Sequence, residues 1–442
     1  MRDCGKLELA LALVAALSVA SVPATAGAQG FSSDRSSAEG PGFKAGRLVL
    51  HPGLSLEGGY DSNVFLQDTN EEDSFILRLV GYLDVATEGA ERQSQGDSNK
   101  AEPQKIEFRG GLGVQYYHFF IDRIPDNLGG DAHVDVSYNP SNVFSLQVRD
   151  VFRRTIRPFS DPNTVQGATV SYGHNSNTAT VDLVGRSKSQ VLEGRVGYTN
   201  GLEFFDADIY QYGNSMTHRV PAALTWKFFP TSALVYTFDY AAQRFQNPDE
   251  ILASATLLSD NNRVSNWIGY NGAITERFSL TAMIGYAVGF YEIGSDFDGV
   301  IARIDARWRP RPTITFVAGF DRDYRPSFIG NYTLMNRLYA DVRFVVSGAL
   351  QLGLKTWVSF DQSGLAIRPD GTLLGTTPTR DDTRVHAGIF GEYRFKAWLA
   401  LFGEVGYLAD FTDFQYLGVD PLLDPSANYQ RFEAWLGLRV FY

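Results

Sequence analysis

The chain ends with Arg431-Phe432-Glu433-Ala434-Trp435-Leu436-Gly437-Leu438-Arg439-Val440-Phe441-Tyr442, a stretch in which two kinds of side chain alternate. One parity is apolar and contains Phe432, Ala434, Leu436, Leu438, Val440 and Tyr442. The other parity carries charge and contains Arg431, Glu433, Trp435, Gly437, Arg439 and Phe441. Because successive side chains of a β-strand point to opposite faces, the stretch predicts a strand with one apolar and one polar face.

The same alternation recurs upstream, for example in residues 300–309, 350–361 and 384–395. Aromatic residues gather near the ends of such segments, as in Phe75, Tyr116, Tyr198, Trp226, Phe228, Tyr324 and Tyr407. A soluble β-sandwich also alternates, but many long segments with one apolar face and aromatic ends are typical of an outer-membrane barrel. Closure into a barrel also pairs every backbone group, as lipid requires. The sequence therefore predicts an all-β, antiparallel, up-and-down transmembrane barrel.

Counting these segments predicts about 18 strands, with about 16 as the alternative. The expected strands start near Leu48, Ser74, Lys105, Asp131, Val143, Asn177, Gln190, Thr217, Ala233, Arg263, Phe278, Val300, Thr313, Asn336, Leu350, Thr383, Ala397 and Asn428. From the fourth strand on, short turns such as 139–142 alternate with long loops such as 154–176, 246–262, 362–382 and 412–427. Short periplasmic turns and long extracellular loops are typical of this class, so we expect both termini to be periplasmic.

The N-terminal residues have the pattern of a targeting segment. Residues 1–28 contain an apolar stretch followed by Ala24-Thr25-Ala26-Gly27-Ala28, which offers cleavage after Ala26 or Ala28. They predict a secretory signal peptide. Residues 29–46 are rich in Ser and Gly and predict a disordered periplasmic linker.

Residues 47–442 predict the barrel, which a polar insertion interrupts at residues 87–104. This insertion falls where a short turn is expected. Either it is a periplasmic loop, or the strand count is wrong by two at this point. Its polar composition, poor in aromatic residues, favours the loop.

The composition narrows the class of protein. The 442 residues include 43 Gly, 31 Phe and 22 Tyr, and the 1 Cys stands at position 4 inside the expected signal peptide. Without cysteine, the mature chain would have neither disulfides nor thiolate metal sites. After the N-terminus no apolar run is long enough for a transmembrane helix. The net charge of −11 argues against nucleic acid as a partner.

The stretch from Leu50 to Phe65 reads Leu50-His51-Pro52-Gly53-Leu54-Ser55-Leu56-Glu57-Gly58-Gly59-Tyr60-Asp61-Ser62-Asn63-Val64-Phe65. It resembles the opening of a porin-like outer-membrane β-barrel family, in which a Pro-x-Leu-x-Leu strand runs into a Tyr-Asp-x-Asn-Val turn. Within that family, the chain looks most like the integral barrels of Wzx/Wzy-dependent exopolysaccharide secretion. The resemblance implies a polysaccharide as cargo and a periplasmic polysaccharide-export protein as partner. The terminal aromatic Tyr442 resembles the signal read by the outer-membrane assembly machinery.

The polar parity predicts which side chains line the lumen. The candidates are Arg109, Arg149, Arg195, Lys227, Trp267, Arg303, Asp305, Arg307, Asp341, Arg343, Trp357, Arg394, Glu404, Glu433, Trp435 and Arg439. Aromatic rings could stack on sugar rings there, and charged groups could exchange hydrogen bonds with hydroxyls. The alternative is that these residues solvate the wall and pair across strands.

Three hypotheses for function follow: a channel that exports exopolysaccharide, a diffusion porin for small polar solutes, and a structural or adhesive barrel. An inward-folding loop that forms an eyelet would favour the porin, and residues 154–176 and 362–382 are long enough for one. We expect no enzyme, because the six histidines are scattered without a nucleophile at a recognisable spacing. We also expect no cofactor and no metal, since the acidic loop 68–73 lacks the EF-hand pattern.

Overall fold

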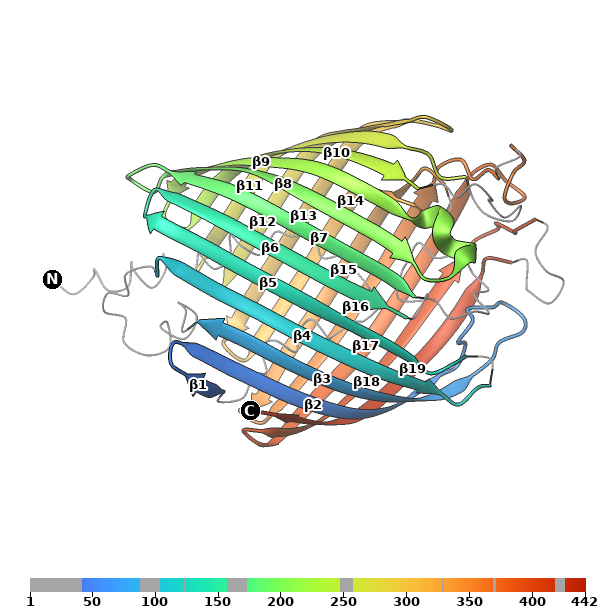
Figure 1. Ribbon diagram of the computed structural model, residues 1–442, viewed down its shortest axis with the longest axis horizontal. Coiled ribbons are helices and arrows are strands. Elements are labelled where there is room, and N and C mark those ends of the chain that lie inside the picture. The colour runs from blue at the N-terminus through green and yellow to red at the C-terminus, as the bar shows by residue number, and fades with distance from the viewer. Residues whose placement is uncertain are drawn as a thin grey trace.

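The computed structural model describes residues 42–87, 104–122, 124–156, 173–246, 257–327, 330–368, 371–417 and 426–442. In these residues the chain forms an all-β, closed, antiparallel barrel (Figure 1). Each strand from β2 to β19 pairs with the next one in the sequence, and β19 pairs with β2. The barrel is therefore of the up-and-down type, with 18 strands in the ring and a short additional strand, β1.

The first half of the ring contains β2 (Leu48–Asp61), β3 (Ser74–Thr87), β4 (Ile106–Phe119), β5 (Asn127–Ser141), β6 (Phe144–Thr155), β7 (His174–Arg186), β8 (Leu192–Phe205), β9 (Ser215–Phe229) and β10 (Ser232–Phe245). The second half contains β11 (Asn261–Thr275), β12 (Phe278–Tyr291), β13 (Phe297–Arg311), β14 (Ile314–Pro326), β15 (Tyr332–Ser347), β16 (Leu350–Ser363), β17 (Arg380–Lys396), β18 (Leu399–Phe411) and β19 (Tyr429–Phe441). Every expected strand start lies within four residues of an observed one. The prediction of 18 strands is confirmed, and the alternative of 16 is wrong.

The insertion between β3 and β4 adds no strand to the ring. β3 pairs directly with β4, from Ile76 opposite Phe119 to Ala86 opposite Arg109. The strand count is therefore not in error at this point. Most of the insertion, residues 88–103, lies outside the described residues.

The end of the expected linker differs from the prediction, because Phe43–Ala45 forms β1 and pairs with Leu48–Leu50 of β2. β19 covers β2 only from Gly53 to Asp61, so the first residues of β2 have a free edge, which attracts another strand. The ring of Phe43 stacks on the C-terminal Tyr442 with centroids 4.1 Å apart. The expected signal peptide and residues 29–41 lie outside the described residues.

The two ends of the barrel differ in their connections. Apart from the insertion between β3 and β4, short turns join the strands at the end that holds both β1 and the C-terminus, and we call it the turn end (Figure 1). At the opposite end, the loop end, the connections are longer and include the 3-10 helix η3 (Asp208–Gly213). From β5 on, the alternation of short turns and longer loops agrees with the sequence prediction.

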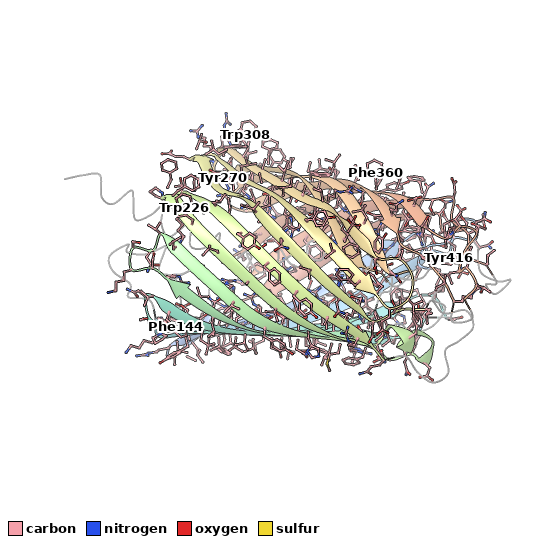
Figure 2. The ribbon with its side chains drawn as sticks, turned by 90° about the horizontal axis from the view of Figure 1, so that it is seen from above. Phe144, Trp226, Tyr270, Trp308, Phe360 and Tyr416 are labelled. Carbon is pink, nitrogen blue, oxygen red and sulfur yellow. The ribbon has the colours of Figure 1, made fainter. Side chains whose placement is uncertain are left out.

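The outer face is apolar along its whole height. On β13, for example, the outward Val300, Ile304 and Trp308 are each nearly half exposed, whereas the inward Ile301 is fully buried. Outward aromatic side chains gather near the turn end, including Phe144, Trp226 and Trp308, far from Tyr416 at the loop end (Figure 2). A second group of outward aromatics lies near the loop end: Phe75, Phe204, Tyr240, Phe290, Phe360, Phe411 and Phe432.

An apolar band between two aromatic girdles matches the profile of a bilayer, so the surface supports a location in the bacterial outer membrane. No helix in the described residues is long and apolar enough to cross a membrane.

Candidate functional site on the inner wall

The register of the strand pairs places all sixteen candidate side chains on the inner face, opposite the exposed apolar residues. They come from β4 (Arg109), β6 (Arg149), β8 (Arg195), β9 (Lys227), β11 (Trp267), β13 (Arg303, Asp305, Arg307), β15 (Asp341, Arg343), β16 (Trp357), β17 (Arg394), β18 (Glu404) and β19 (Glu433, Trp435, Arg439). These strands surround the lumen, so the candidates line a wall and do not converge on one centre.

The junction of the first and last strands of the ring is held by a buried ion pair. Arg431 of β19 donates from Nε and from one terminal nitrogen to the two carboxylate oxygens of Asp61 in β2, at 2.9 and 2.7 Å. The same guanidinium lies 2.9 Å from the carboxylate of Glu433. Such two-pronged pairs are stronger and more specific in geometry than single contacts. Among the sequence candidates, Glu433 belongs to this group, whereas Arg431 and Asp61 were missed.

Next to this pair, Trp435 packs into a cluster of charged and aromatic groups. The guanidinium of Arg78 lies 4.1 Å from the centre of the indole ring and pairs with Glu57. The indole nitrogen donates to Glu433 at 2.5 Å, and Ser55 donates to Glu57 at 2.7 Å. Trp435 is thus buried in the wall, so its ring is not an open platform for a sugar.

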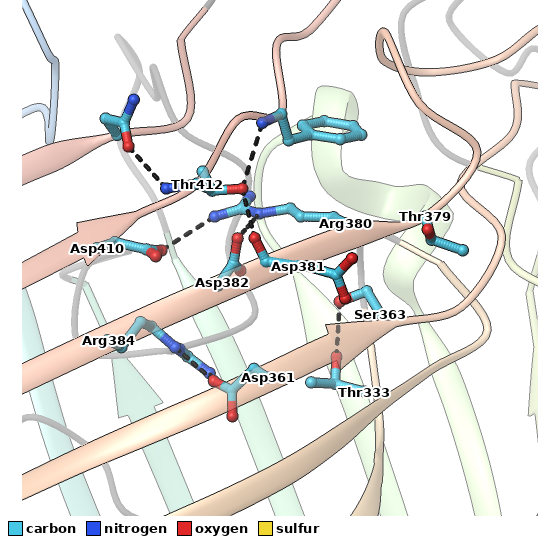
Figure 3. A network of polar contacts seen from close by, with 12 residues as sticks. Thr333, Asp361, Ser363, Thr379, Arg380, Asp381, Asp382, Arg384, Asp410 and Thr412 are labelled. Atoms are coloured by element: carbon cyan, nitrogen blue, oxygen red, sulfur yellow. Dashed lines mark hydrogen bonds and ion pairs between the residues drawn. The ribbon is translucent and has the colours of Figure 1, made fainter.

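A third cluster joins β16, β17 and β18 at the loop end (Figure 3). Arg380 pairs with Asp382 at 2.7 Å and with Asp410 at 3.0 Å, and it donates to the hydroxyl of Tyr416 at 2.9 Å. Arg384 binds Asp361. The residues of this cluster were not among the sequence candidates, although Arg380, Asp382 and Arg384, which share one face of the strand and alternate in charge, could have indicated them.

A fourth cluster lies on β13 to β15 and brings predicted residues together. The carboxylate of Asp321 lies 3.2 to 3.6 Å from the guanidinium groups of three arginines: Arg303, Arg325 and Arg337. Arg303 also lies over the ring of Trp267, 5.6 Å from its centre. Asp305 accepts a hydrogen bond from Tyr339 at 2.8 Å. The Arg303–Trp267 and Tyr339–Asp305 contacts each skip a strand, which requires the concave side of the wall.

The remaining candidates fall into paired and unpaired groups. Arg394 and Arg439 both bind Glu392, Arg149 binds Asp135, and Trp357 stacks on His386 at 5.6 Å. Arg109, Asp341, Arg343 and Glu404 also take part in interactions on this face. Arg195, Lys227 and Arg307 form no ion pair with a carboxylate within the described residues.

The connection between β2 and β3 folds into the barrel. Val64, Phe65 and Leu66 are buried and pack against inner-face residues of β3, β4, β18 and β19, namely Ile76, Tyr117, Phe119, Phe402, Tyr429 and Trp435. The fully buried Asn63 fastens this inward turn, because its amide donates to the carbonyls of Gln67 and Gln430 at 2.7 and 2.9 Å. The sequence analysis identified these residues as a turn but missed its direction. For an eyelet, it named residues 154–176 and 362–382 as long enough.

The two loops that are long enough for an eyelet differ in how much of them the structure describes. Residues 157–172 lie outside the described residues. Residues 364–368 and 371–379 lie at the loop end, where Ala366 and Leu374 meet Phe414, Tyr416 and Ala427 of the β18–β19 connection. The backbone nitrogen of Leu257, just before β11, donates to the carbonyl of Ile367 at 2.8 Å. Connections from separate parts of the ring thus contact one another at the loop end, and we call this group the loop cap.

The loop cap includes η3. Tyr210 and Tyr212 pack against Phe205 and Leu258. Burial raises the pKa of Tyr210 to about 12 and also raises the pKa values of Tyr212 and Tyr416. The phenols of the loop cap therefore stay neutral at physiological pH.

No protein-family model and no curated protein sequence matches the chain. Among solved structures, the outer-membrane protein OpdK from Pseudomonas aeruginosa aligns with 9% identity and a TM-score of 0.44, over 89% of this chain and 99% of that one. OccAB4 from Acinetobacter baumannii aligns with 11% identity and a TM-score of 0.43, over 89% and 98% of the two chains. The siderophore receptor PirA from Pseudomonas aeruginosa aligns with 10% identity and a TM-score of 0.42, over 89% and 80%. Because the sequence identities are only 9 to 11%, no functional residue of these proteins is assigned to this chain.

Proposed function

We propose that the protein is an outer-membrane channel for hydrophilic solutes of the carbohydrate type. The observation that carries this proposal is the contrast between the two faces of one closed wall, apolar outside and charged inside. Barrels of about 16 to 18 strands are wide enough for an aqueous passage. A wall of fixed, paired charges favours solutes that exchange hydrogen bonds with it, so the role is transport, not catalysis.

The proposal also includes the orientation of the barrel in the outer membrane. The turn end, with β1 and Tyr442, faces the periplasm, and the loop cap faces the outside, as is typical of barrels with short periplasmic turns. Outer-membrane lipids contact the aromatic girdles, and the assembly machinery reads the strand that ends at Tyr442.

Export of a polysaccharide is the more specific form of the proposal. It is supported by the resemblance of residues 50–65 to exopolysaccharide-secretion barrels and by inner-wall aromatics such as Trp267 and Trp357. In this form, a periplasmic polysaccharide-export protein delivers the polymer to the turn end.

A diffusion porin is the second candidate, and the inward turn favours it. Val64, Phe65 and Leu66 occupy space on the inner side of β3 and β4. An inward constriction limits the size of solutes, which suits small molecules better than a polymer.

The test is deletion of the gene in its native bacterium, followed by complementation with the wild type, Phe65→Ala or Phe75→Ala. Phe75 is the matched control, because it faces outward and is 65% exposed, whereas Phe65 faces inward and is 2% exposed. Loss of extracellular polysaccharide, with normal uptake of small sugars, would support export. Reduced uptake with normal polysaccharide would support the porin, and Phe65→Ala should then admit larger solutes while Phe75→Ala should not. If both remain normal and the purified barrel does not conduct ions in a bilayer, the channel proposal is wrong.

A further inference from the structure

The inner wall formed by β9 to β12 contains an arginine whose surroundings differ from those of its neighbours. Arg219, Ala241, Arg263 and Gly289 lie in one row across four strands. Small residues therefore flank Arg263 on both sides, and the ring of Phe297 covers Gly289.

Arg263 lacks a carboxylate partner within the described residues. The nearest candidate on the adjacent strand, Asp239, is bound to Arg219 at 2.5 Å. The one polar contact of the Arg263 side chain in the described part of the chain is a long one, 3.5 Å from a terminal nitrogen to the amide oxygen of Gln243. Its Nε is buried and has no hydrogen-bond partner. An unpaired buried guanidinium is costly, so its retention calls for an explanation.

Two further buried polar atoms beside Arg263 also lack partners. They are the hydroxyl of Tyr291 and the amide oxygen of Asn261. Asn261 and Tyr291 are directly opposite in the register of β11 and β12, and Asn261 lies two residues before Arg263 on the same face. One charged donor, one hydroxyl and one acceptor thus face the same part of the inner wall near the loop end.

We propose that Arg263, Tyr291 and Asn261 form a binding site for an anionic oxygen group, a carboxylate or phosphate, on a hydroxylated solute. This inference rests on the proposed channel function and names the class of solute, an acidic sugar. The anionic group would accept hydrogen bonds from Nε of Arg263 and from the hydroxyl of Tyr291, and charge-assisted hydrogen bonds of this kind are the strong ones. A sugar hydroxyl would donate to the amide oxygen of Asn261.

Three other inner-wall arginines near the loop end differ from Arg263 because each of them has a carboxylate partner. Arg380, Arg384 and Arg431 each bind at least one carboxylate. The carboxylates of the protein itself bind these guanidinium groups, so these arginines hold the wall together. Arg263 has donors to spare, which is what a site for a transient ligand requires.

The test is isothermal titration of the purified, folded protein in detergent with three probes: sodium D-galacturonate, inorganic phosphate and D-galactose. We expect galacturonate to bind and neutral galactose not to bind. Phosphate binding would identify a general anion site, and its failure would assign the site to sugar carboxylates. Arg263→Gln should weaken binding by at least about tenfold, the effect of losing one charge-assisted hydrogen bond. Equal binding of galacturonate and galactose, or binding of neither anion, would overturn the proposal.

Arg186→Gln is the matched control. Arg186 also lies on the inner face, but it is paired with Glu193 at 2.9 Å near the turn end. This variant should keep the wild-type affinity for galacturonate. If it loses affinity as much as Arg263→Gln does, the effect is a general one of wall charge and the proposed site is wrong.

Thermal unfolding supplies a readout that does not depend on ligand. Because Arg263 is unpaired, Arg263→Met should unfold at a temperature no lower than the wild type when no ligand is present. Galacturonate should raise the unfolding temperature of the wild type but not that of Arg263→Met. A strong destabilisation by Arg263→Met would show that Arg263 is structural, which contradicts the proposal.

Measurement of ion conductance in a bilayer tests the channel function separately from the proposed binding site. A barrel that conducts ions but binds neither anion would leave the channel standing and overturn the site. Binding without conductance would leave the site standing and overturn the channel.

Discussion

The closure region of the barrel, formed by β16 to β19 with β2 and β3, differs from the wall formed by β9 to β12. In the closure region, Arg431, Arg384 and Arg380 are each bound to buried carboxylates. In the wall of β9 to β12, Arg263 forms no ion pair with a carboxylate among the described residues, and its Nε has no hydrogen-bond partner there. The comparison separates charges that hold strands together from charges left available to a solute.

The physical reason lies in the order of the strands along the chain. Neighbouring strands such as β10 and β11 are joined by a local connection, so their pairing costs little chain entropy. β2 and β19 lie at opposite ends of the barrel sequence, and closing the ring costs the entropy of a long loop. Buried ion pairs between these two strands add stabilisation and specify their register.

The largest effect is expected from breaking the ion pair at the junction of β2 and β19. Arg431→Ala leaves the buried carboxylate of Asp61 without its guanidinium partner and removes the ion pair with the part-buried Glu433. Removal of one member of a buried pair typically costs about 3 to 5 kcal/mol. We expect a corresponding loss in the free energy of unfolding, measured by denaturant titration of tryptophan fluorescence in detergent micelles.

The double variant Asp61→Asn with Arg431→Met tests the cause. Because both charges are removed, it should recover most of the stability lost in Arg431→Ala. If the double variant is less stable than the single one, packing and not charge accounts for the effect.

The inward turn is expected to be nearly as sensitive. Phe65→Ala removes a large buried aromatic side chain from the cluster with Tyr117 and Trp435. Substitutions of this kind cost about 3 kcal/mol or more. The free energy of unfolding should fall by that amount, whereas Phe75→Ala on the outer face should change it much less in detergent. Equal losses in the two variants would contradict the inward packing of Phe65.

The loop cap should loosen at alkaline pH. Since burial raises the pKa of Tyr210 to about 12, the folded loop favours the neutral phenol. The stability that this preference supplies is present below about pH 10, the ordinary pKa of tyrosine, and is lost as the pH rises toward the raised value. Cleavage at the loop end by an alkali-tolerant protease should therefore increase from pH 9 to pH 11.

The variant Tyr210→Phe with Tyr212→Phe isolates the phenols of η3. It should show a smaller increase in cleavage over the same pH range, because phenylalanine does not titrate. An unchanged pH profile would assign the loosening to other groups.

The end of the chain offers a smaller effect on stability. Tyr442→Ala removes the stacking contact with Phe43, and such contacts contribute about 0.5 to 1.5 kcal/mol beyond the buried area. We expect a modest decrease in unfolding free energy. If Tyr442 is also the assembly signal, the amount of heat-modifiable barrel in the outer membrane should fall more than the stability predicts. Phe43→Ala is the control, since it removes the same contact and leaves the terminal aromatic.

The smallest effect is expected from Arg149→Gln. Arg149 and Asp135 form an ion pair whose side chains are 39% and 32% exposed, and ion pairs of that exposure contribute about 0 to 1 kcal/mol. The free energy of unfolding should barely change. A loss as large as that of Arg431→Ala would remove the distinction between the closure region and the rest of the wall.

Much of the fold was predictable because it depends on local pattern. The period of two in segments such as 300–309 predicts both the strand and the face of each side chain, without knowledge of any partner strand. The same pattern placed Arg303 and Trp267 on the inner wall. It could not show that their side chains meet, because that contact crosses from β13 to β11.

Sequence patterns could not predict the contacts that close the ring or the inward direction of the turn between β2 and β3. Arg431 and Asp61 are 370 residues apart in the sequence. The residues around each of them do not indicate that the two side chains form an ion pair. Phe65 follows a recognisable turn motif, yet its burial depends on the space between Tyr117 and Trp435, which exists only once the ring is closed.

The sequence by itself determined an 18-strand barrel with an apolar outside and a charged inside, since these properties follow from alternation and from the spacing of turns. The tertiary structure decided which charges neutralise one another. Arg431 is bound to the carboxylates of Asp61 and Glu433, whereas the buried Nε of Arg263 has no partner among the described residues. The reason is that ion pairing depends on distance between side chains, and in a closed barrel that distance is set by the register of strands far apart in the sequence.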